Sequence, residues 1–378
     1  MGATLERYRV HNAQALSTPA LLIYSEMIDA NIAAALRMMN GDVNRWRPHL
    51  KTAKLGYTMR RMVEKGVLNA KCATTLELIS AIDAGMEDVV LAFPVMGANA
   101  ARVREIAAAH PDRKISVLVE GPEQLNEWRG SSIGIFIDLN SGMNRTGMAE
   151  ERFEEVRGFV EQVLRAGLEF RGLHHYDGHI HNTEAAAATT AYDGYAKLLG
   201  LIEHLEKCDI NVGEVITSGT PAMPHALKFA GFNSADFVHR VSPGTIIYND
   251  RSSLKELPGY GFLPAALVLA TVVSQPMANR VTCDAGHKAV AADAGVPTCE
   301  ALGWPGLVGL KPSEEHLPMD AAAKMPARGD MLYLLPTHVC PTVNNFDKAV
   351  IIRDGKVETI EPVTARGREV FVRSAAGA

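Results

Sequence analysis

The chain has 378 residues, of which 47% are hydrophobic and 21% charged, a composition typical of a soluble globular protein with one large and one smaller domain. The formal net charge is −5 and there is no basic run, so we expect no nucleic-acid partner. The chain shows no apolar leader, no membrane-length apolar run and no CxxC pair among its five cysteines, so we expect a cytoplasmic protein with no membrane partner.

Short apolar runs alternate with helix-sized amphipathic segments from about residue 20 onward. The predicted strands are residues 20–24, 46–51, 70–73, 89–93, 115–119, 133–139, 172–176 and 215–217. The predicted helices include residues 27–39, 76–85, 101–110, 152–166 and 192–205. Eight strands, each followed by a helix-sized gap, predict a parallel (β/α)8 TIM barrel over residues 20–250. A doubly wound open sheet is the alternative, and it is weaker because no GxGxxG follows the first strand.

The pattern changes after about residue 250. Strand-like runs at 262–274, 280–284, 331–335 and 349–353 follow one another without long helices between them. Asp354-Gly355 comes directly after the last of these runs and is typical of a hairpin turn. Residues 251–378 therefore predict an antiparallel β domain.

The segment Arg47-Pro48-His49-Leu50-Lys51 ends the second predicted strand. Side chains alternate along a strand, so Arg47, His49 and Lys51 are expected on one face. A lysine inside a barrel is costly as an ammonium but useful as a free amine, which can form an imine. Arg47, as a close cationic neighbour, is expected to favour the free amine. The segment therefore predicts a Schiff-base lysine, most often one that holds pyridoxal phosphate (PLP).

Polar side chains also follow the later predicted strands, and barrel enzymes place their active sites at the carboxyl ends of strands. These side chains are Asp138, Asn140 and Arg145 after the sixth strand, Tyr176, Asp177, His179 and His181 after the seventh, and Ser218, Gly219 and Thr220 after the eighth. Any one of them alone is more simply a loop residue, but their joint placement on one rim favours an active site.

Two short segments are candidates for a phosphate site. Ser218-Gly219-Thr220 has a glycine that permits close approach and hydroxyls that can donate. Pro243-Gly244-Thr245, with Tyr248 just beyond, is the second candidate. Either tripeptide alone is more simply a turn, but a Schiff-base lysine in the same barrel makes a PLP phosphate the stronger interpretation.

His338 and Cys340 follow a predicted strand and would point the same way in an extended chain. An imidazole and a thiolate could then share a metal whose other positions stay open, as in catalytic rather than structural sites. The alternative is a buried cysteine that behaves as a small hydrophobe, which is the favoured interpretation of these two residues taken alone.

Together these motifs resemble those of the D-threonine aldolase and eukaryotic-type D-serine dehydratase family, within the alanine-racemase-like, fold-type III PLP enzymes. The resemblance begins at Arg47-Pro48-His49-Leu50-Lys51 and spans nearly the whole chain. It continues through Lys71-Cys72-Ala73-Thr74, residues 138–147, 172–179, Pro243-Gly244-Thr245, residues 284–288, Glu314-Glu315-His316 and residues 338–344.

The resemblance implies a barrel that carries PLP, a β domain that carries a divalent metal and includes residues 1–19, and a homodimer. Lys51 would hold the cofactor by an imine, and His338 with Cys340 would bind the metal. The predicted cofactor contacts are His49, Lys51, Arg145, Tyr176, Ser218, Gly219, Thr220, Gly244, Thr245 and Tyr248.

Two residues depart from the aldolase pattern. Typical D-threonine aldolases have an aspartate where this chain has Cys340, whereas the D-serine dehydratases use His and Cys, and a thiolate favours zinc over manganese or magnesium. The aldolases also carry a histidine near the substrate's β-hydroxyl, where an ungapped match gives Asn182. His179 and His181 both stay open for that role, and with Lys51 and Tyr176 they are the predicted catalytic residues.

The resemblance implies a lyase that acts on D-β-hydroxy-α-amino acids. Retro-aldol cleavage of Cα–Cβ to glycine and an aldehyde, as in D-threonine aldolases, is favoured. Elimination to a keto acid and ammonia, as in D-serine dehydratases, is the alternative. An amino-acid racemase would need a second base, for which Tyr333 is a candidate, and a non-catalytic PLP-binding protein would lack the β domain.

Overall fold

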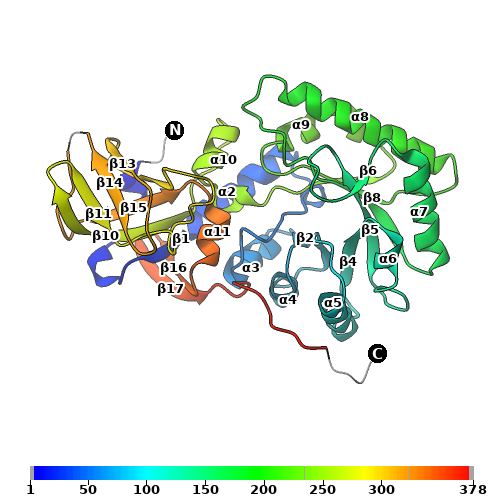
Figure 1. The fold of residues 1–378 in the computed structure, drawn as a ribbon, viewed down its shortest axis with the longest axis horizontal. Coiled ribbons are helices and arrows are strands. Elements are labelled where there is room, and N and C mark those ends of the chain that lie inside the picture. Colours follow the sequence, from blue (N-terminus) through cyan, green and yellow to red (C-terminus); the bar gives the residue numbers. More distant parts are fainter. Residues whose placement is uncertain (1–3, 234, 323, 374–378) are drawn as a thin grey trace. The chain divides into compact units, whose positions relative to one another are not determined.

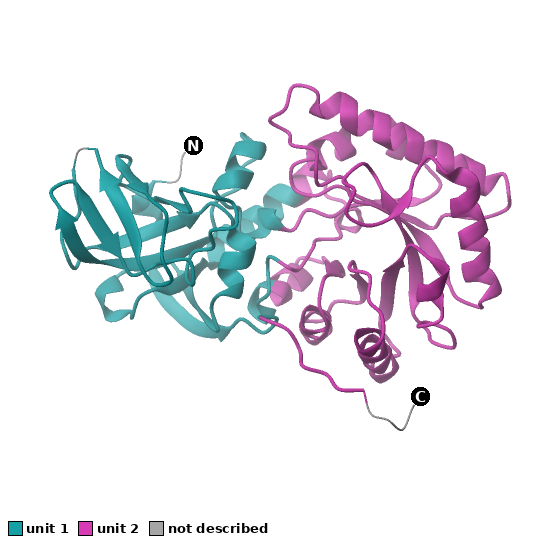
Figure 2. Cartoon of the chain, in the orientation of Figure 1, with its two compact units in different colours: residues 1–35, 52–58, 245–366 teal, residues 36–51, 59–244, 367–378 magenta. Residues whose placement is uncertain are grey.

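The computed structural model describes residues 4–233, 235–322 and 324–373. The chain divides into two compact units (Figure 2). Unit 1 contains the residues up to 35, 52–58 and 245–366, and unit 2 contains 36–51, 59–244 and the residues from 367 on. The domain boundaries expected from the sequence, 20–250 for the barrel and 251–378 with 1–19 for the β domain, remain a prediction. In the described part of the chain, no helix is both long and apolar enough to cross a membrane.

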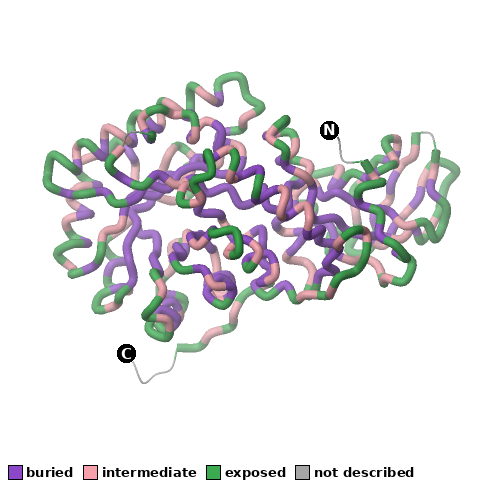
Figure 3. The backbone as a smooth tube through the Cα atoms, turned by 180° about the vertical axis from the view of Figure 1, so that it is seen from behind, coloured by how far each residue is buried: buried purple, intermediate pink, exposed green. Residues whose placement is uncertain are grey.

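Unit 2 is built on a parallel sheet with the strand order β2-β3-β4-β5-β7-β8-β9, and the short β6 pairs with β5. Its strands are buried almost throughout (Figure 3), as expected for a parallel sheet covered on both faces. They are β2 (Asn69–Cys72), β3 (Asp88–Leu91), β4 (Lys114–Val119), β5 (Gly134–Asn140), β6 (Met148–Ala149), β7 (Phe170–His175), β8 (Glu214–Thr217) and β9 (Val238–Val241).

The segment 46–49 joins the two edges of this sheet. Trp46 forms a parallel bridge to Val241 of β9, and His49 forms one to Lys71 of β2. Pro48 lies between them and has no N–H to donate, so two separate bridges form in place of a continuous strand. The segment therefore occupies the first strand position of a closed barrel, and the predicted (β/α)8 fold is confirmed.

Two strand assignments made from the sequence are corrected. Residues 20–24, expected as the first barrel strand, form β1 (Ala20–Tyr24) and pair with strands of unit 1. β9 takes the eighth barrel position, and the polar pair His239-Arg240 inside this short strand concealed it in the sequence. The numbering of the strands therefore shifts by one. Ser218-Gly219-Thr220 follows the seventh barrel strand, and Pro243-Gly244-Thr245 follows the eighth.

Helices follow the barrel strands and lie outside the sheet (Figure 1). Helix α4 begins with a reciprocal cap, because the Thr74 hydroxyl accepts the Glu77 N–H and the Glu77 carboxylate accepts the Ala73 N–H. The helices of unit 2 that follow strand positions are α3 (Gly56–Glu64), α4 (Thr75–Asp83), α5 (Ala98–Ala109), α6 (Pro122–Leu125), α7 (Phe153–Arg165), α8 (Ala187–Glu206) and α9 (Met223–Lys228), with short 3₁₀ turns at Val43–Arg45 and Ala230–Phe232.

The barrel interior is polar at both ends and apolar between them. The apolar layer consists of Val90, Leu118, Phe136 and Ile216. At the amino ends of the strands, the Arg47 guanidinium lies between the carboxylates of Asp88 and Glu214. At the carboxyl ends, register places Asp138 of β5 beside His174 of β7. The polar layer at the carboxyl ends is where barrel enzymes place their chemistry.

Unit 1 is built on a sheet with the strand order β11-β14-β13-β12-β15-β10-β1-β16-β17. Strand β10 also pairs with β11, so the first six strands of this order close into an antiparallel barrel, which confirms the predicted β domain. The strands are β10 (Ala266–Met277), β11 (Arg280–Cys283), β12 (Cys299–Ala301), β13 (Leu307–Gly309), β14 (Leu317–Ala321), β15 (Met331–Pro336), β16 (Lys348–Arg353) and β17 (Lys356–Pro362).

Strand β1 lies in the middle of this sheet, antiparallel to β10 and parallel to β16. Leu22 and Tyr24 of β1 pack in one apolar cluster with Leu267 and Leu269 of β10. The predicted hairpin is present, because Asp354 and Gly355 adopt positive φ values of 49° and 69° between β16 and β17. The remaining helices are α1 (Leu5–Tyr8), α2 (Ser25–Met38), α10 (Arg251–Glu256) and α11 (Val339–Asn344), with 3₁₀ turns at Ala13–Ala15 and Thr245–Ile247.

Candidate active site

Lys51 follows the bridging segment 46–49 directly, at the carboxyl end of the first barrel position. Its backbone N–H donates to Nδ1 of His49 over 3.3 Å. His49 is half-buried, and desolvation of its ring together with the charges of Lys51 and Lys71 lowers its pKa well below the usual range. His49 is therefore a neutral ring beside two lysine amines.

A chain of three buried polar side chains lies next to Lys51. Nζ of Lys71 is 3.0 Å from Nε2 of His174, and Nδ1 of His174 is 2.7 Å from a carboxylate oxygen of Asp138. Burial and then the Lys71 charge lower the pKa of His174 to about 4, so its ring is neutral at pH 7. The short contact with the carboxylate assigns the ring hydrogen to Nδ1 and leaves Nε2 to accept from Lys71.

Burial and then the neighbouring charge of Lys51 lower the pKa of Lys71 to about 7. Burial alone would raise the pKa of Asp138, but its contacts with His174, Thr146 and Lys71 together outweigh burial and lower it. The carboxyl end of the barrel therefore contains an anionic Asp138 and a second lysine that titrates near neutrality.

Tyr176, one residue beyond β7, is surrounded by cationic and aromatic groups. Its ring stacks on His174 at an interplanar angle of 6° with centroids 6.4 Å apart. The guanidinium of Arg145 and the amine of Lys71 lie 5.2 and 5.3 Å from its centroid. Two of the predicted cofactor contacts, Arg145 and Tyr176, are thus brought together with Lys71.

The loop after β8 has the features of an anion cradle. The hydroxyl oxygens of Ser218 and Thr220 are buried and have no hydrogen-bond partner among the described residues. Ser218 adopts a φ of 54°, an unusual conformation for a residue other than glycine. A Cβ at Gly219 would lie 3.1 Å from the Tyr176 ring, so only glycine lets the loop approach that ring without displacing it.

The loop after β9 lies beside the loop after β8. The Ser242 hydroxyl donates to the carbonyl oxygen of Ser218 over 2.6 Å. A Cβ at Gly244 would lie 2.2 Å from the carbonyl oxygen of His49, so glycine is required there as well. The phosphate segment after β9 therefore contacts the bridging segment that leads to Lys51, and the segment after β8 lies beside it.

Tyr248 and Thr245 belong to unit 1 and make other contacts. The Tyr248 hydroxyl donates to the carbonyl oxygen of Ala53 over 2.8 Å and lies 2.7 Å from the Thr58 hydroxyl. Thr245 Oγ1 lies 3.8 Å from Sγ of Cys340. The Tyr248 hydroxyl therefore has hydrogen-bond partners within unit 1, and its expected contact with the cofactor remains a prediction.

The residues of unit 2 fit PLP. The group requires an amine for its aldehyde, a flat surface for its ring and uncommitted donors for its phosphate. Lys51 provides the amine, Tyr176 with Arg145 provides the surface, and the buried hydroxyls of Ser218 and Thr220 are the donors. The two hydroxyls are the clearest sign, because a buried hydroxyl without a partner is costly unless a ligand satisfies it.

The two candidate histidines beyond β7 differ in their surroundings. His179 is partly buried, and a Cβ at Gly142 would lie 3.3 Å from its Nε2. Its Nδ1 is buried and finds no hydrogen-bond partner in the described part of the chain. His181 is exposed, and Asn182 is partly buried. Between the two histidines, His179 is the one held against the loop that carries Arg145.

The role expected for Arg47 is wrong. Its guanidinium is fully buried at the amino ends of the strands and forms bidentate contacts of 2.6 to 3.1 Å with Glu214 and Asp88. These two carboxylates neutralise its charge, so it is not the cation that influences Lys51. A cationic neighbour of Lys51 is Lys71, which the sequence marked only as part of the motif Lys71-Cys72-Ala73-Thr74 and not as a site residue.

His338 and Cys340 lie in unit 1, but not in the extended geometry expected. His338 is the N-cap residue of α11, and Cys340 lies in the first turn of that helix. Their side chains nevertheless meet, and hydrogen bonding to Cys340, followed by the Asp293 carboxylate 2.5 Å from His338 Nδ1, raises the pKa of His338 to about 9. Cys340 Sγ also lies 3.0 Å from the Thr52 hydroxyl.

This pair fits a divalent metal with open positions. An imidazole nitrogen and a thiolate are zinc ligands, and a carboxylate on Nδ1 is the usual partner that turns Nε2 toward a metal. Asp250 accepts the N–H of Val339 over 3.0 Å and so fixes the start of α11. Among the described residues, no group of three or more His, Cys, Asp or Glu side chains is arranged to hold a metal, so water or substrate would complete the coordination.

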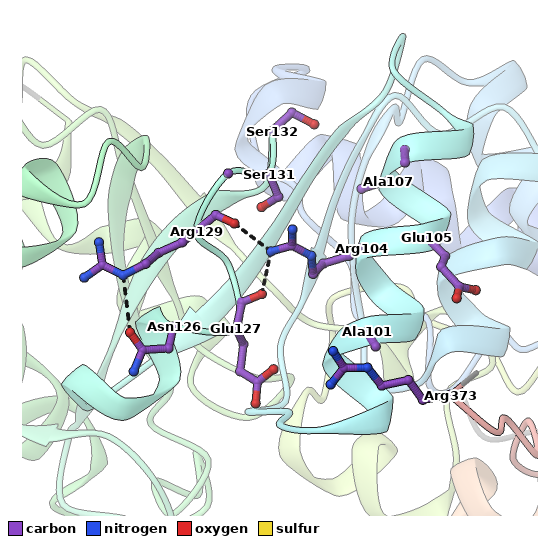
Figure 4. A pocket seen from close by; sticks show the side chains of 12 residues that line it. Ala101, Arg104, Glu105, Ala107, Asn126, Glu127, Arg129, Ser131, Ser132 and Arg373 are labelled. Atoms are coloured by element: carbon purple, nitrogen blue, oxygen red, sulfur yellow. Dashed lines mark hydrogen bonds between the residues drawn. The ribbon is translucent and has the colours of Figure 1, made fainter. Parts of the chain in front are cut away.

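Two cavities of unit 2 differ in their relation to these residues. One, of about 740 Å³, lies on the outside of the barrel between α5 and the segment after α6 (Figure 4). Its Arg104 donates to the carbonyl oxygens of Glu127 and Arg129, and it includes none of the predicted site residues. A second, of about 670 Å³, is lined by Glu120, Asn140 and Arg145 at the carboxyl ends of β4 and β5. The second cavity adjoins the Tyr176 cluster through Arg145.

Similar proteins were found by sequence and by structure. The chain matches the family described as "Alanine racemase, N-terminal domain" over residues 23–252 and that described as "Putative serine dehydratase domain" over residues 265–352. A D-threonine aldolase of Arthrobacter sp is 28% identical over 367 residues, which cover 93% of each chain. These matches confirm the resemblance that the motifs indicated.

Two solved structures share the fold. D-threonine aldolase from Filomicrobium marinum has a TM-score of 0.85 at 24% identity, covering 95% of this chain and 98% of that one. D-threo-3-hydroxyaspartate dehydratase from Delftia sp. HT23 has a TM-score of 0.79 at 21% identity, covering 92% and 97%. The prediction that the chain is an enzyme is confirmed by these comparisons. Because the alanine racemase match alone spans more than half of the 378 residues, the protein belongs to the alanine racemase N-terminal domain family.

Proposed function

We propose that the protein is a PLP- and divalent-metal-dependent lyase of D-β-hydroxy-α-amino acids, of the D-threonine aldolase type. The observation that carries the proposal is the cradle of Ser218, Gly219 and Thr220, in the same barrel that holds Lys51. Its two buried hydroxyls have no hydrogen-bond partner among the residues that the structure describes. The likeness to D-threonine aldolases over most of both chains supports the reaction type.

Each bound group supplies one part of the chemistry. PLP supplies an electron sink for the negative charge at Cα, and the divalent metal supplies a Lewis acid for the β-hydroxyl. Lys51 holds the cofactor, and Arg145 and Tyr176 orient its ring. His338 and Cys340 hold the metal, with Asp293 orienting the imidazole. Zinc suits this donor pair better than manganese or magnesium.

We assign His179 as the base that takes the proton from the β-hydroxyl oxygen. It is partly buried, contacts the loop at Gly142 and has an uncommitted nitrogen, whereas His181 is exposed. A positioned base contributes about 10²–10⁴ in rate. His179→Ala should therefore lose activity by about that factor, while His181→Ala, the matched control, should keep most of it. Equal losses would contradict the assignment.

Elimination to a keto acid and ammonia is the second candidate reaction. Cys340 favours it, because the dehydratases of the family pair His with Cys, and the match to the serine dehydratase domain over residues 265–352 includes this residue. A racemase is less supported, because the Tyr333 hydroxyl accepts the Val10 N–H and lies within unit 1. Homodimer formation and a cytoplasmic location remain predictions.

Product analysis decides between the two lyase reactions. The holoenzyme is incubated with D-threonine, D-serine and D-threo-3-hydroxyaspartate, and the products are identified by mass spectrometry. We expect glycine and the matching aldehyde, with little turnover of the L-isomers. Keto acid and ammonia would establish the dehydratase reaction instead. Lys51→Ala should abolish both reactions and the borohydride-reducible attachment of PLP.

A further inference from the structure

The buried chain of Asp138, His174 and Lys71 has no task in the proposed function. Nδ1 of His174 lies 2.7 Å from an Asp138 carboxylate oxygen, and Nε2 of the same ring lies 3.0 Å from Nζ of Lys71. The three residues come from β5, β7 and β2, and each is at most 4% exposed. Both nitrogens of the His174 imidazole are therefore held by partners on other strands.

The His174 imidazole in turn supports the ring of Tyr176. The two rings are parallel to within 6°, with centroids 6.4 Å apart, an offset stacked arrangement that aromatic pairs favour. The two edges of the Tyr176 ring face glycine backbone, since a Cβ at Gly178 would collide with Cε1 and a Cβ at Gly219 would lie 3.1 Å from Cε2. The Tyr176 ring is thus confined by glycines at its edges and by His174 on one face.

We propose that Lys71 is a positioning residue for the cofactor ring. Together with Asp138 it fixes the His174 imidazole, and the imidazole fixes the Tyr176 ring against which PLP would lie. The proposal rests on the proposed function, since it takes Tyr176 as the flat surface for PLP. With only 1% of its surface exposed, Lys71 acts through the two rings and not by contact with the cofactor. No bond is made or broken in this role.

Positioning and charge make different predictions for the two ends of this chain of side chains. Lys71→Met removes the donor to Nε2 of His174, and Asp138→Asn offers Nδ1 an amide that can donate, which moves the ring hydrogen to Nε2. Either change frees the imidazole, so both variants should bind the cofactor ring less tightly. If Lys71 acted only as a cation near an anionic ligand, loss of this cation would weaken binding, and loss of the Asp138 anion would strengthen it.

Binding of pyridoxine 5′-phosphate to the full-length, cofactor-free protein tests this role. This compound has the ring and the phosphate of PLP but an alcohol in place of the aldehyde, so it cannot form an imine with Lys51. Isothermal titration calorimetry near neutral pH measures its affinity. Inorganic phosphate, titrated in the same way, reports on the cradle after β8 alone. Far-ultraviolet circular dichroism checks that each variant is folded.

For both Lys71→Met and Asp138→Asn we expect the affinity for pyridoxine 5′-phosphate to fall about 2- to 10-fold, the range that aromatic stacking contributes. The affinity for inorganic phosphate should stay close to the wild-type value. In the holoenzymes, the visible circular dichroism band of bound PLP should shift or weaken, because it depends on the orientation of the ring. Lys114→Met, an exposed lysine at the start of β4, is the control and should match the wild type. Lys71→Gln serves the same test if the methionine variant does not fold.

Three outcomes would overturn this inference alone. Weaker binding in Lys71→Met with tighter binding in Asp138→Asn would mean that Lys71 acts by its charge. Equal losses of affinity for pyridoxine 5′-phosphate and for inorganic phosphate would assign the effect to the cradle. Wild-type affinity and an unchanged dichroism band in both variants would mean that the three side chains only pack. Failure of the wild-type protein to bind pyridoxine 5′-phosphate would overturn the proposed cofactor as well.

Discussion

Burial of the Lys71 ammonium destabilises the folded protein, and this effect can be measured without any cofactor. Its ammonium is taken from water into a site where Lys51 is a like charge, and the hydrogen bond to His174 offsets only part of this. A lysine whose pKa falls from its ordinary value of 10.5 to about 7 contributes stability that is present above about pH 10 and lost as the pH falls toward 7.

Lys71→Met should therefore stabilise the cofactor-free protein most near pH 7. The unfolding free energy of the wild type should rise relative to that of the variant between about pH 7 and 10, because the unfolded chain binds more protons in that range. Urea denaturation at pH 7, 8.5 and 10 measures the difference. If the difference in unfolding free energy between wild type and variant does not change with pH, the pKa of Lys71 is not lowered in the folded protein.

Gly142 should be needed for the placement of His179. Its φ is 104°, and an added Cβ would lie 3.3 Å from Nε2 of His179. Gly142→Ala should thus reduce turnover by displacing the imidazole as well as straining the backbone. Gly41→Ala is the matched control, since Gly41 has a φ of 81° with nothing within 4 Å of the added Cβ. Similar activity in the two variants would show that the reaction does not depend on the placement of His179.

Asp293 should set the metal affinity of the His338–Cys340 pair. Removing a carboxylate that orients a metal-bound imidazole typically lowers affinity or activity about 10- to 100-fold. Asp293→Asn should weaken binding by about that factor when zinc is titrated against a competing chelator, and the circular dichroism spectrum should not change. Unchanged affinity would mean that Asp293 only hydrogen-bonds to the ring.

For single residues, the sequence predicted the position along each strand better than it predicted which side chains come into contact. Lys51, Arg145 and Tyr176 lie at strand ends as expected, because alternation and barrel rules apply to each strand separately. The chain of Lys71, His174 and Asp138 was missed, since it depends on the register between β2, β5 and β7, which no local pattern encodes. Arg47 was misplaced for the same reason.

At the scale of elements, closure of the barrel depends on the ion network at the amino ends of the strands. Arg47 comes from the bridging segment, Asp88 from β3 and Glu214 from β8. Arg171 of β7 and Arg240 of β9 also contact these carboxylates. The bridging segment 46–49 forms one β-bridge to each neighbouring strand. Side-chain contacts must therefore supply much of the stability that a regular strand obtains from its backbone hydrogen bonds.

Arg47→Met should destabilise the fold strongly. Removing one partner from a buried ion network costs about 3–5 kcal/mol, because the remaining charges stay buried without it. We expect a lower urea midpoint and a loss of the cooperative transition in unit 2. Arg157→Met is the control, because this half-buried arginine forms ion pairs with Glu154 and Glu161 of its own helix and should change stability little. If Arg47→Met unfolds at the same urea concentration as the wild type, closure of the barrel does not depend on this ion network.

The strand assignments that failed share a physical origin. Residues 20–24 form an apolar run that suits either sheet, and only pairing with β10 and β16 decides between them. β9 escaped prediction because His239 and Arg240 interrupt its apolar character, although both are paired in the structure. Long strands and amphipathic helices such as α7 and α8 were predictable because their periodicity is strong.

At the scale of the whole molecule, the two units are formed from interleaved stretches of one chain. The chain passes from one unit to the other after residues 35, 51, 58, 244 and 366. Unit 1 also requires β1 from near the start of the chain, since this strand lies between β10 and β16. A single cut near residue 250 therefore separates β1 from both of its partners, although every strand of the parallel sheet of unit 2 stays in the first half.

Fragment 251–378, expressed alone, should accordingly fail to fold. It lacks β1, so one edge each of β10 and β16 loses its partner. We expect weak near-ultraviolet circular dichroism and rapid proteolysis for this fragment, and partial recovery when it is mixed with fragment 1–250. A stable, cooperatively unfolding fragment 251–378 would contradict this dependence on β1.

The position of β1 also sets an order of events during synthesis. Residues 20–24 leave the ribosome early, but their antiparallel partner begins at residue 266 and their parallel partner at residue 348. At a translation rate of about 5–20 residues per second, this apolar strand waits for roughly 15–60 s before its second edge can be covered. The nascent chain must therefore keep Leu21, Leu22 and Ile23 away from other chains during this interval.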